Sequence, residues 1–173
     1  TSDDHFGRVA FYEYLDRRAL RRADAVVAVA DALRHRLVAC GVPAVRCWTI
    51  HNGLPEEMTG SEEYRNDSTV QAAVDFCRRG PTVCGVGRLS QEKDFATLIH
   101  GFERAVRCVA GLQLLILGEG DLRPELEDLV ARLGLADRVR LPGYVAAEPV
   151  LPYAKLLAIT SRTEGLPIVL LEA

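Results

Sequence analysis

The sequence contains very little lysine, no long hydrophobic run and no closely paired cysteines. Of its 21 basic residues, only Lys93 and Lys155 are lysines. No run of 18 uncharged apolar residues occurs, so no membrane-spanning helix is predicted. The first residues, TSDDHFGR, contain no basic region followed by an apolar stretch and so do not resemble a secretory signal. Because lysine is so rare in this chain, each lysine is a candidate for a specific role.

Metal, disulfide and nucleic-acid chemistry are also disfavoured. The five cysteines are odd in number and include no C-x-x-C pair, which indicates buried thiols in a reducing compartment. The four histidines have no metal-ligand spacing with one another or with cysteine, so no metal site is expected. The net charge of -3 provides no basic field, so no nucleic-acid partner is expected.

The first part of the chain alternates between helix and strand patterns. Helices are predicted over 6–23 and 31–40, and strands over 25–30 and 46–50. Residues 55–80 are polar and acidic, and we interpret them as a linker that contains some helix. This pattern predicts an α/β unit over 1–54, a linker over 55–80 and a second α/β domain over 81–173.

From Pro81 onward the alternation is regular. Strands are predicted over 82–87, 112–118, 139–143 and 156–161, with helices over 94–108 and 121–134 and another beginning at Leu166 or Pro167. Such alternation predicts a parallel sheet with helices on both faces. In the common strand order 3-2-1-4, the first and fourth strands are neighbours and ligands bind at their carboxyl ends. The loops 87–93 and 161–167 are therefore predicted to face each other across a ligand crevice.

The first of these loops offers two cations, Arg88 and Lys93, and glycines at 85 and 87 that would let a ligand approach the backbone. The second leads into a helix after Gly165, whose first turn has unpaired N–H groups and a positive dipole end. Two cations and a helix N-terminus suit an anion such as a diphosphate. The alternative is that both cations are solvated loop charges.

Two acids, Glu164 and Glu172, are separated in an E-x7-E pattern. Glu164 precedes the predicted helix, whereas Glu172 lies about 7–8 Å along it beyond the first turn. A carboxylate accepts two hydrogen bonds side by side, as the vicinal hydroxyls of a ribose or hexose donate them. The spacing thus suits a ligand whose diols flank a diphosphate. The alternative, which spacing alone favours, is that Glu172 is an ordinary surface residue.

Several segments resemble a known family. In this order, GVGRLSQEKDFATLIHGF, LLILGEGDLRPELEDLVARLGL, RVRLPGY and SRTEGLPIVLLEA resemble the nucleotide-binding domain of retaining GT-B glycosyltransferases, especially family 4. ADAVVAVADALRHRL and HNGLP resemble the end of the preceding acceptor-side domain. The resemblance implies a GT-B type α/β fold with Rossmann-like parallel sheets. The chain would hold the end of the N-terminal domain and most of the donor-binding domain.

The resemblance also implies roles for individual residues. Arg88 and Lys93 would bind the donor diphosphate, Glu164 the hydroxyls of the transferred sugar, and Glu172 the nucleotide ribose. Arg88, Lys93 and Glu164 would be the catalytic residues. The full donor-binding set implied is Gly87, Arg88, Lys93, Val145, Gly165, Leu166, Pro167 and Glu172. No cofactor and no bound metal are implied, because cationic side chains and a helix end would neutralise the phosphates.

The implied reaction is sugar transfer from a nucleoside-diphosphate sugar, first among them a UDP-sugar, to a glycan or lipid-linked acceptor in polysaccharide biosynthesis. The implied location is the cytoplasm, with peripheral association at the inner face of the cytoplasmic membrane as an option. We expect an internal fragment of a protein roughly twice as long, inactive by itself.

Two alternatives remain at this stage. One is a non-catalytic nucleotide- or sugar-binding module with the same α/β architecture. The other is a Rossmann oxidoreductase. The sequence argues against an oxidoreductase, because GVGRLS is not G-x-G-x-x-G and the acid after LQLLILG lies within the following turn.

Overall fold

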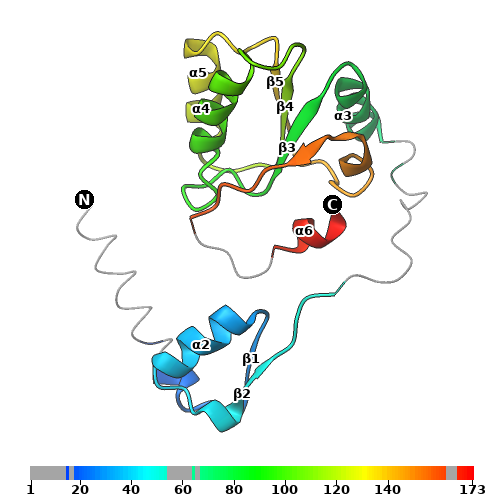
Figure 1. The fold of residues 1–173 in the computed structure, drawn as a ribbon. Helices are drawn as coiled ribbons and strands as arrows, with labels where there is room; N and C mark the ends of the chain where they lie inside the picture. Colours follow the sequence, from blue (N-terminus) through cyan, green and yellow to red (C-terminus); the bar gives the residue numbers. More distant parts are fainter. Residues whose placement is uncertain (1–14, 16–17, 54–63, 65–66, 163–166) are drawn as a thin grey trace. The chain divides into compact units, whose positions relative to one another are not determined.

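The computed structural model describes residues 15, 18–53, 64, 67–162 and 167–173 (Figure 1). By its internal contacts the chain divides into two compact units, Thr1–Gly53 and Leu54–Ala173. The second unit holds the four-stranded sheet whose carboxyl edge carries the predicted site.

The first unit is a small parallel β-α-β arrangement. Strand β1 (Val26–Ala28) leads into helix α2 (Asp31–Ala39), and a 3-10 turn, η1 (Ala44–Arg46), leads into strand β2 (Cys47–Thr49). The strands pair in parallel with Val26 opposite Cys47, and both residues are buried in the core of this unit. Both predicted strands are therefore present, each shorter than its apolar run.

Asp31 lies at the start of helix α2 but does not cap it. It is the first helical residue, and the preceding Ala30 is the N-cap. The Thr49 hydroxyl donates a 2.6 Å hydrogen bond to Asp31 Oδ1, which lowers the pKa of this carboxyl. Asp31 thus joins the start of α2 to the end of β2. Of the helix predicted over 6–23, only residue 15 and residues 18–23 are described, and residues 15 and 18–20 are helical.

The second unit contains a fully parallel sheet in the order β5-β4-β3-β6. Its strands are β3 (Thr82–Val86), β4 (Gln113–Leu117), β5 (Val139–Gly143) and β6 (Leu156–Leu157). Counted from Pro81, this is the predicted order 3-2-1-4. The fourth strand is shorter than the predicted range 156–161, because its ladder with β3 runs only from Val83–Leu156 to the Ala158 N–H, which donates to the Cys84 carbonyl (2.8 Å).

Helices cover both faces of this sheet. Leu114 and Ile116 of β4 join the cluster formed with helices α4 (Phe95–Ala105) and α5 (Arg123–Arg132), whereas Leu115 and Leu117 join the cluster formed with helix α3 (Ser68–Arg78). Figure 1 shows α4 and α5 on one side of the sheet and α3 on the other. Full burial of one such leucine contributes about 1.5–3 kcal/mol to the free energy of folding. Because β4 places such side chains in both clusters, it forms the centre of this unit's core.

Helix α3 corrects part of the linker prediction. The segment does contain helix, but α3 buries Val70, Val74 and Phe76 against the sheet and so forms one of its covering layers. Its start is fixed by Asp67, whose Oδ1 accepts from the N–H of Thr69 (2.7 Å). The polar residues ahead of the helix concealed this apolar face, which only the helical spacing of 70–77 indicates.

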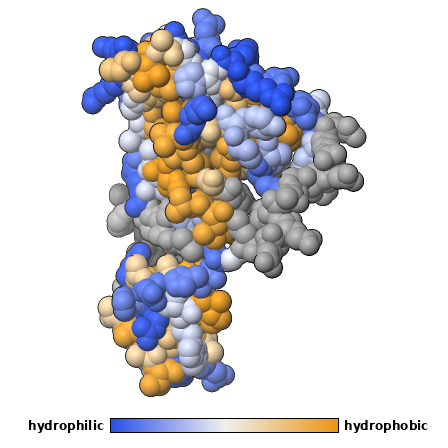
Figure 2. Space-filling view, turned by 45° about the vertical axis from the view of Figure 1, so that its right-hand side comes forward, coloured by the Kyte–Doolittle hydropathy of each residue, from blue (hydrophilic) through white to orange (hydrophobic). Residues whose placement is uncertain are grey.

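The last elements of the unit are a 3-10 turn, η3 (Leu151–Tyr153), and helix α6 (Ile168–Glu172), for which Pro167 is the N-cap. Strand β6 is an edge strand, and large apolar side chains are exposed on and after it: Leu156, Ile159, Ile168 and Leu170. Figure 2 shows hydrophobic surface on one face of this unit. Across the described residues, no helix combines the length and apolarity needed to cross a bilayer.

Candidate functional site

The predicted site residues gather at the carboxyl edge of the sheet. Each parallel strand ends at this edge, and four loops follow: 87–94 after β3, 118–122 after β4, 144–150 after β5 and 158–162 after β6. The loops after β3 and β6 are neighbours because these two strands pair directly. This is the edge at which open α/β sheets bind ligands.

The ends of β3 and β4 approach each other closely at two glycines. The Gly87 N–H donates to the Leu117 carbonyl (3.0 Å), and the Gly118 N–H donates to the Gly143 carbonyl (2.8 Å). A Cβ placed on Gly118 would lie only 1.9 Å from the Gly87 carbonyl oxygen. Gly87 and Gly118 have φ of +150° and +149°, a region that L side chains rarely adopt. Gly118 therefore serves strand approach and needs no ligand to explain it.

Leu89 fixes the loop after β3. Its side chain is fully buried, its N–H donates to the Glu119 carbonyl (2.9 Å), and its carbonyl accepts from the Leu122 N–H (3.1 Å). A Cβ on Gly120 would meet the Leu89 backbone at 2.4 Å. The G-E-G turn after β4 is thus shaped to accept this loop, which leaves the neighbouring Arg88 with a fixed backbone position.

The two predicted diphosphate ligands, Arg88 and Lys93, both lie on the loop after β3. Lys93 lays its aliphatic stem over Gly87, where a Cβ would come within 3.2 Å of Lys93 Cε. The Arg88 side chain is 72% exposed and lies 3.8 Å from the Asp121 carboxylate, itself 95% exposed. An exposed pair at this distance is weak, so Arg88 can leave Asp121 for an anionic ligand. The Lys93 stem thus lies against Gly87, the residue next to Arg88, and the diphosphate-binding role of both cations stays a prediction.

The loops after β3 and β6 are tied together by three hydrogen bonds. The Thr160 hydroxyl donates to the Lys93 carbonyl (3.0 Å), the Arg162 N–H donates to the Glu92 carbonyl (2.9 Å), and Arg162 Nε donates to Asp94 Oδ2 (3.1 Å). The hydrogen bond from Arg162 is the main cause that lowers the pKa of Asp94. These contacts place Thr160 and Arg162 against the loop after β3, and residues 163–166 of the predicted facing loop lie outside the described residues.

A cleft of about 290 Å³ opens where β3, β4 and β5 end. Its walls include the predicted residues Gly87, Arg88 and Val145, together with Gly118, Glu119 and Tyr144. The Val145 side chain is only 5% exposed and packs into the cluster on the α3 face, so it supports the wall. Tyr144 is 84% exposed and offers an aromatic face at the rim.

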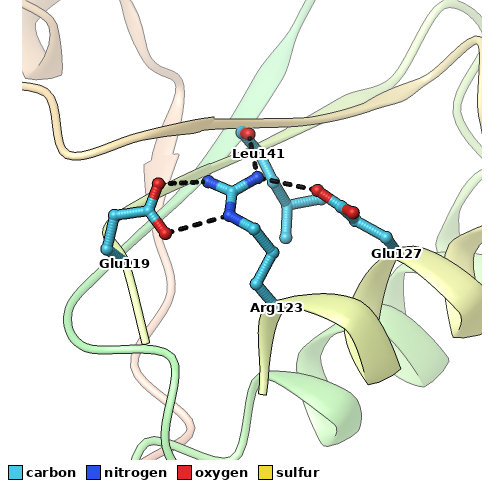
Figure 3. Close-up of polar contacts among 4 residues, drawn as sticks. All are labelled: Glu119, Arg123, Glu127 and Leu141. Atoms are coloured by element: carbon cyan, nitrogen blue, oxygen red, sulfur yellow. Dashed lines mark hydrogen bonds and ion pairs between the residues drawn. The ribbon is translucent and has the colours of Figure 1, made fainter. Parts of the chain in front are cut away.

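A guanidinium holds the β4 side of this cleft. Arg123 donates to both carboxylate oxygens of Glu119 (2.7 and 2.9 Å), to Glu127 (2.7 Å) and to the Leu141 carbonyl (3.0 Å), as Figure 3 shows. The hydrogen bonds from Arg123 lower the pKa of Glu119. Arg123 thus joins the turn after β4 to helix α5 and strand β5.

Some predicted residues are not described by the structure. Glu164, Gly165 and Leu166 lie outside the described residues, and nothing is determined for the Glu172 side chain, although Glu172 ends helix α6. Pro167 is described and caps α6 at its N-terminus. The E-x7-E hypothesis for Glu164 and Glu172 therefore stays a prediction.

One glycine role is corrected by the structure. A Cβ on Gly85 would lie 2.9 Å from Leu98 Cδ2 and 3.0 Å from Phe95 Cε1, both of helix α4. Gly85 is buried beneath that helix and cannot admit a ligand to the backbone. Its role is close packing of α4 on β3.

Sequence reasoning missed Asp94, Thr160, Arg162 and Arg123. Of these, only Asp94 gave a signal in the sequence, because an acid at a predicted helix start is a candidate N-cap. The partners of the others lie on different loops or strands, so no local pattern could reveal them. No group of three or more His, Cys, Asp or Glu side chains in the described part of the chain is placed to hold a metal ion.

Comparison with protein families gives two matches. Residues 80–173 match the family model described as glycosyl transferases group 1, which covers more than half of the chain. Residues 4–57 match the model described as glycosyltransferase family 4.

Two curated relatives match nearly the whole chain. The alpha-D-kanosaminyltransferase of Streptomyces kanamyceticus is 28% identical over 169 residues, which cover 92% of this chain and 42% of that protein. The GDP-mannose-dependent alpha-(1-6)-phosphatidylinositol monomannoside mannosyltransferase of Mycobacterium tuberculosis is 30% identical over 174 residues, which cover 91% of this chain and 44% of that protein. The chain therefore spans less than half the length of these relatives.

Solved structures show the same fold. Anabaena HepE in complex with UDP and glucose superposes with a TM-score of 0.73 at 25% identity, over 90% of this chain and 43% of that one. TarM of S. aureus superposes with a TM-score of 0.73 at 20% identity, over 93% of this chain and 30% of that one. The second likeness shows the fold alone.

Proposed function

This chain belongs to the group 1 glycosyl transferases and has their GT-B fold, and on that premise we propose that it forms the donor site of an enzyme that transfers a sugar from a nucleoside-diphosphate sugar. One observation carries the proposal. The loops after β3 and β6 converge at the carboxyl edge of the sheet, with Arg88 and Lys93 both on the loop after β3.

In this proposal the diphosphate of the donor lies against Arg88, Lys93 and the backbone at Gly87. The exposed Arg88 guanidinium can bind two phosphate oxygens at once, whereas the Lys93 ammonium acts as a compact charge. The cleft beside them, lined by Glu119 and Tyr144, would receive the nucleoside. Glu172 would bind the ribose and Glu164 the transferred sugar, as the family resemblance implies.

UDP is the nucleotide we propose for the donor. HepE, whose structures contain UDP, UDP-glucose, or UDP and glucose, supports this choice at 25% identity over most of the chain. The name of the mycobacterial relative specifies GDP-mannose, so GDP is the competing nucleotide. Titration with UDP and with GDP separates the two candidates.

The chemistry follows from charge. Cleavage of the sugar–phosphate bond leaves negative charge on the departing diphosphate, and preorganised cations stabilise that charge more in the transition state than in the ground state. Removal of one such donor typically costs about 3–4 kcal/mol, or 10²–10³ in rate. Because Arg88 and Lys93 would supply the positive charge, we propose that no metal is needed. Retention of configuration is part of the same proposal.

We propose a glycan or glycolipid acceptor, met in the cytoplasm or at the inner face of the cytoplasmic membrane. The names of several relatives support this class: one makes lipopolysaccharide core in Rhizobium meliloti, and another acts on a diphospho-undecaprenol glycan in Campylobacter jejuni. The acceptor side would need residues beyond those of this chain's donor site, so the chain alone is expected to bind donor without turnover.

The test is calorimetric titration of the chain with UDP, GDP and ADP. Lys93→Ala should weaken UDP binding about tenfold to a hundredfold, the effect of losing a charge-assisted hydrogen bond worth roughly 1.5–3 kcal/mol. Lys155→Ala is the matched control, since Lys155 directly precedes strand β6 at the amino edge of the sheet, where its N–H donates to the Thr82 carbonyl (2.8 Å). EDTA should leave the affinity unchanged. Equal losses in the two lysine variants would contradict the proposed site.

A further inference from the structure

We infer that Asp94 and Arg162 form a positioning pair that sets Lys93 against the donor diphosphate, an inference that rests on the proposed function. The pair joins the loop after β3 to the loop after β6 through the 3.1 Å bond from Arg162 Nε to Asp94 Oδ2. Neither residue is proposed to touch the donor. Each would act through Lys93, the residue that directly precedes Asp94.

The backbone at Asp94 is in an unusual conformation. Its φ of +48° lies in the left-handed region, and Asp94 is the only non-glycine residue with positive φ in the described part of the chain. Glycine would satisfy that backbone without strain. An aspartate at this position adds a carboxylate, which is 19% exposed and engages Arg162. The strained position therefore holds a side chain that serves the contact between the loops.

The hydrogen bonds between the two loops also hold the backbone of Lys93. Its carbonyl accepts from the Thr160 hydroxyl (3.0 Å), and its stem lies over Gly87. The next residue, Asp94, begins helix α4 as its N-cap and is held by Arg162. The β6 loop thus determines where the Lys93 side chain starts, and hence where its ammonium can reach.

The Arg162 side of the pair is mostly at the surface, and this separates positioning from stability. The Arg162 side chain is 69% exposed, and exposed ion pairs contribute little to folding. Misplacement of a binding group, in contrast, lowers affinity even where the fold is unchanged. Variants of Arg162 are therefore expected to unfold at nearly the same temperature as the unaltered chain but to bind UDP more weakly.

The first experiment measures UDP affinity of Arg162→Met by calorimetry. We expect affinity to fall about fivefold to tenfold, the size of coupling usual between residues in contact. Arg162→Lys should recover part of the loss, since lysine keeps one charged donor. Arg132→Met is the matched control, because Arg132 ends helix α5 and pairs there with Asp128, and both side chains are 62% exposed. The control should bind as the unaltered chain does.

The second experiment repeats Arg162→Met in a Lys93→Ala background. If Arg162 acts through Lys93, the second substitution changes affinity less than twofold once Lys93 is gone. An equal fold loss in both backgrounds would overturn the inference, because Arg162 would then act independently of Lys93. A Lys93→Ala loss with no effect of Arg162→Met would overturn the positioning role and keep the proposed donor site. No binding of UDP, GDP or ADP to the unaltered chain would overturn both.

Discussion

Replacement of Gly118 by alanine tests whether the ends of β3 and β4 must approach as closely as the structure places them. The new Cβ would lie 1.9 Å from the Gly87 carbonyl oxygen, a contact that no real Cβ tolerates. Because the obstacle is backbone and not a flexible side chain, the strand ends must separate. The bond from the Gly87 N–H to the Leu117 carbonyl (3.0 Å) lies at the point of separation.

Two other glycines allow the destabilisation by Gly118→Ala to be divided into backbone strain and overpacking. Gly101 lies exposed inside helix α4 with open space around it, so alanine there should stabilise the chain by about 0.5–1 kcal/mol. Gly134 follows α5 with φ of +68° and has no neighbour within 4 Å, so alanine there should cost about 1 kcal/mol from backbone strain alone. Gly118→Ala combines backbone strain with overpacking of about 1–3 kcal/mol, and we expect about 3 kcal/mol or more.

The assay is urea unfolding followed by far-UV circular dichroism, with alanine substituted singly at Gly101, Gly134 and Gly118. The single tryptophan, Trp48, lies in the first unit and so does not report on this sheet. Hydrogen exchange of the β4 amides locates the effect of Gly118→Ala. UDP titration of the same variant then shows whether the separated strand ends still bind nucleotide.

Equal costs at Gly118 and Gly134 would refute the reasoning, because the close backbone approach would then add nothing to the φ penalty. A stabilised Gly118→Ala would be a stronger contradiction. A destabilised Gly101→Ala would show that the space around α4 is not open, and would remove the control on which the division of energies depends.

Three further predictions follow from side-chain surroundings. Arg123→Met should destabilise the second unit by about 1 kcal/mol, because it removes the hydrogen bonds that Arg123 makes across the β4 turn, as urea unfolding would show. The lowered pKa of Asp94 contributes stability that is present above 3.8 and lost as the pH falls through the lowered value, so any destabilisation by Asp94→Asn should shrink in acid-unfolding curves below pH 3.8. Burial raises the pKa of Cys84 to about 12, so iodoacetamide at pH 8 should label exposed Cys108 and spare Cys84 until urea is added.

The strand order and the placement of the loops could be predicted because they follow from periodic patterns. Buried β4 and the helical spacing of α4 and α5 are visible as apolar repeats, and crossover rules then limit the topology. The extent of β6 could not be predicted in this way. The apolar run 156–161 continues beyond the ladder, but hydrogen bonding to β3 ends at Ala158. Strand length depends on the partner's register, which the run itself does not encode.

Within the site, the sequence indicated which residues carry charge but not what holds them. Arg88 and Lys93 could be named as candidates because cations in a loop after a parallel strand suit an anion. Arg162 was not, because its partner Asp94 is 68 positions away and becomes a neighbour only when β6 pairs with β3. Gly85 shows the reverse case, since a loop-like glycine motif concealed a packing requirement set by helix α4.

Three residues set the position of Lys93. Glycine at 87 leaves room for the lysine stem, Thr160 holds the lysine carbonyl, and Asp94 turns the backbone into helix α4. Gly87 and Asp94 belong to the loop after β3 and Thr160 to the loop after β6, so the arrangement depends on the β3–β6 pairing. A substitution that weakens that pairing should therefore weaken nucleotide binding even when every charged residue is kept. Affinity for UDP would then report the geometry of the sheet edge as well as its charge.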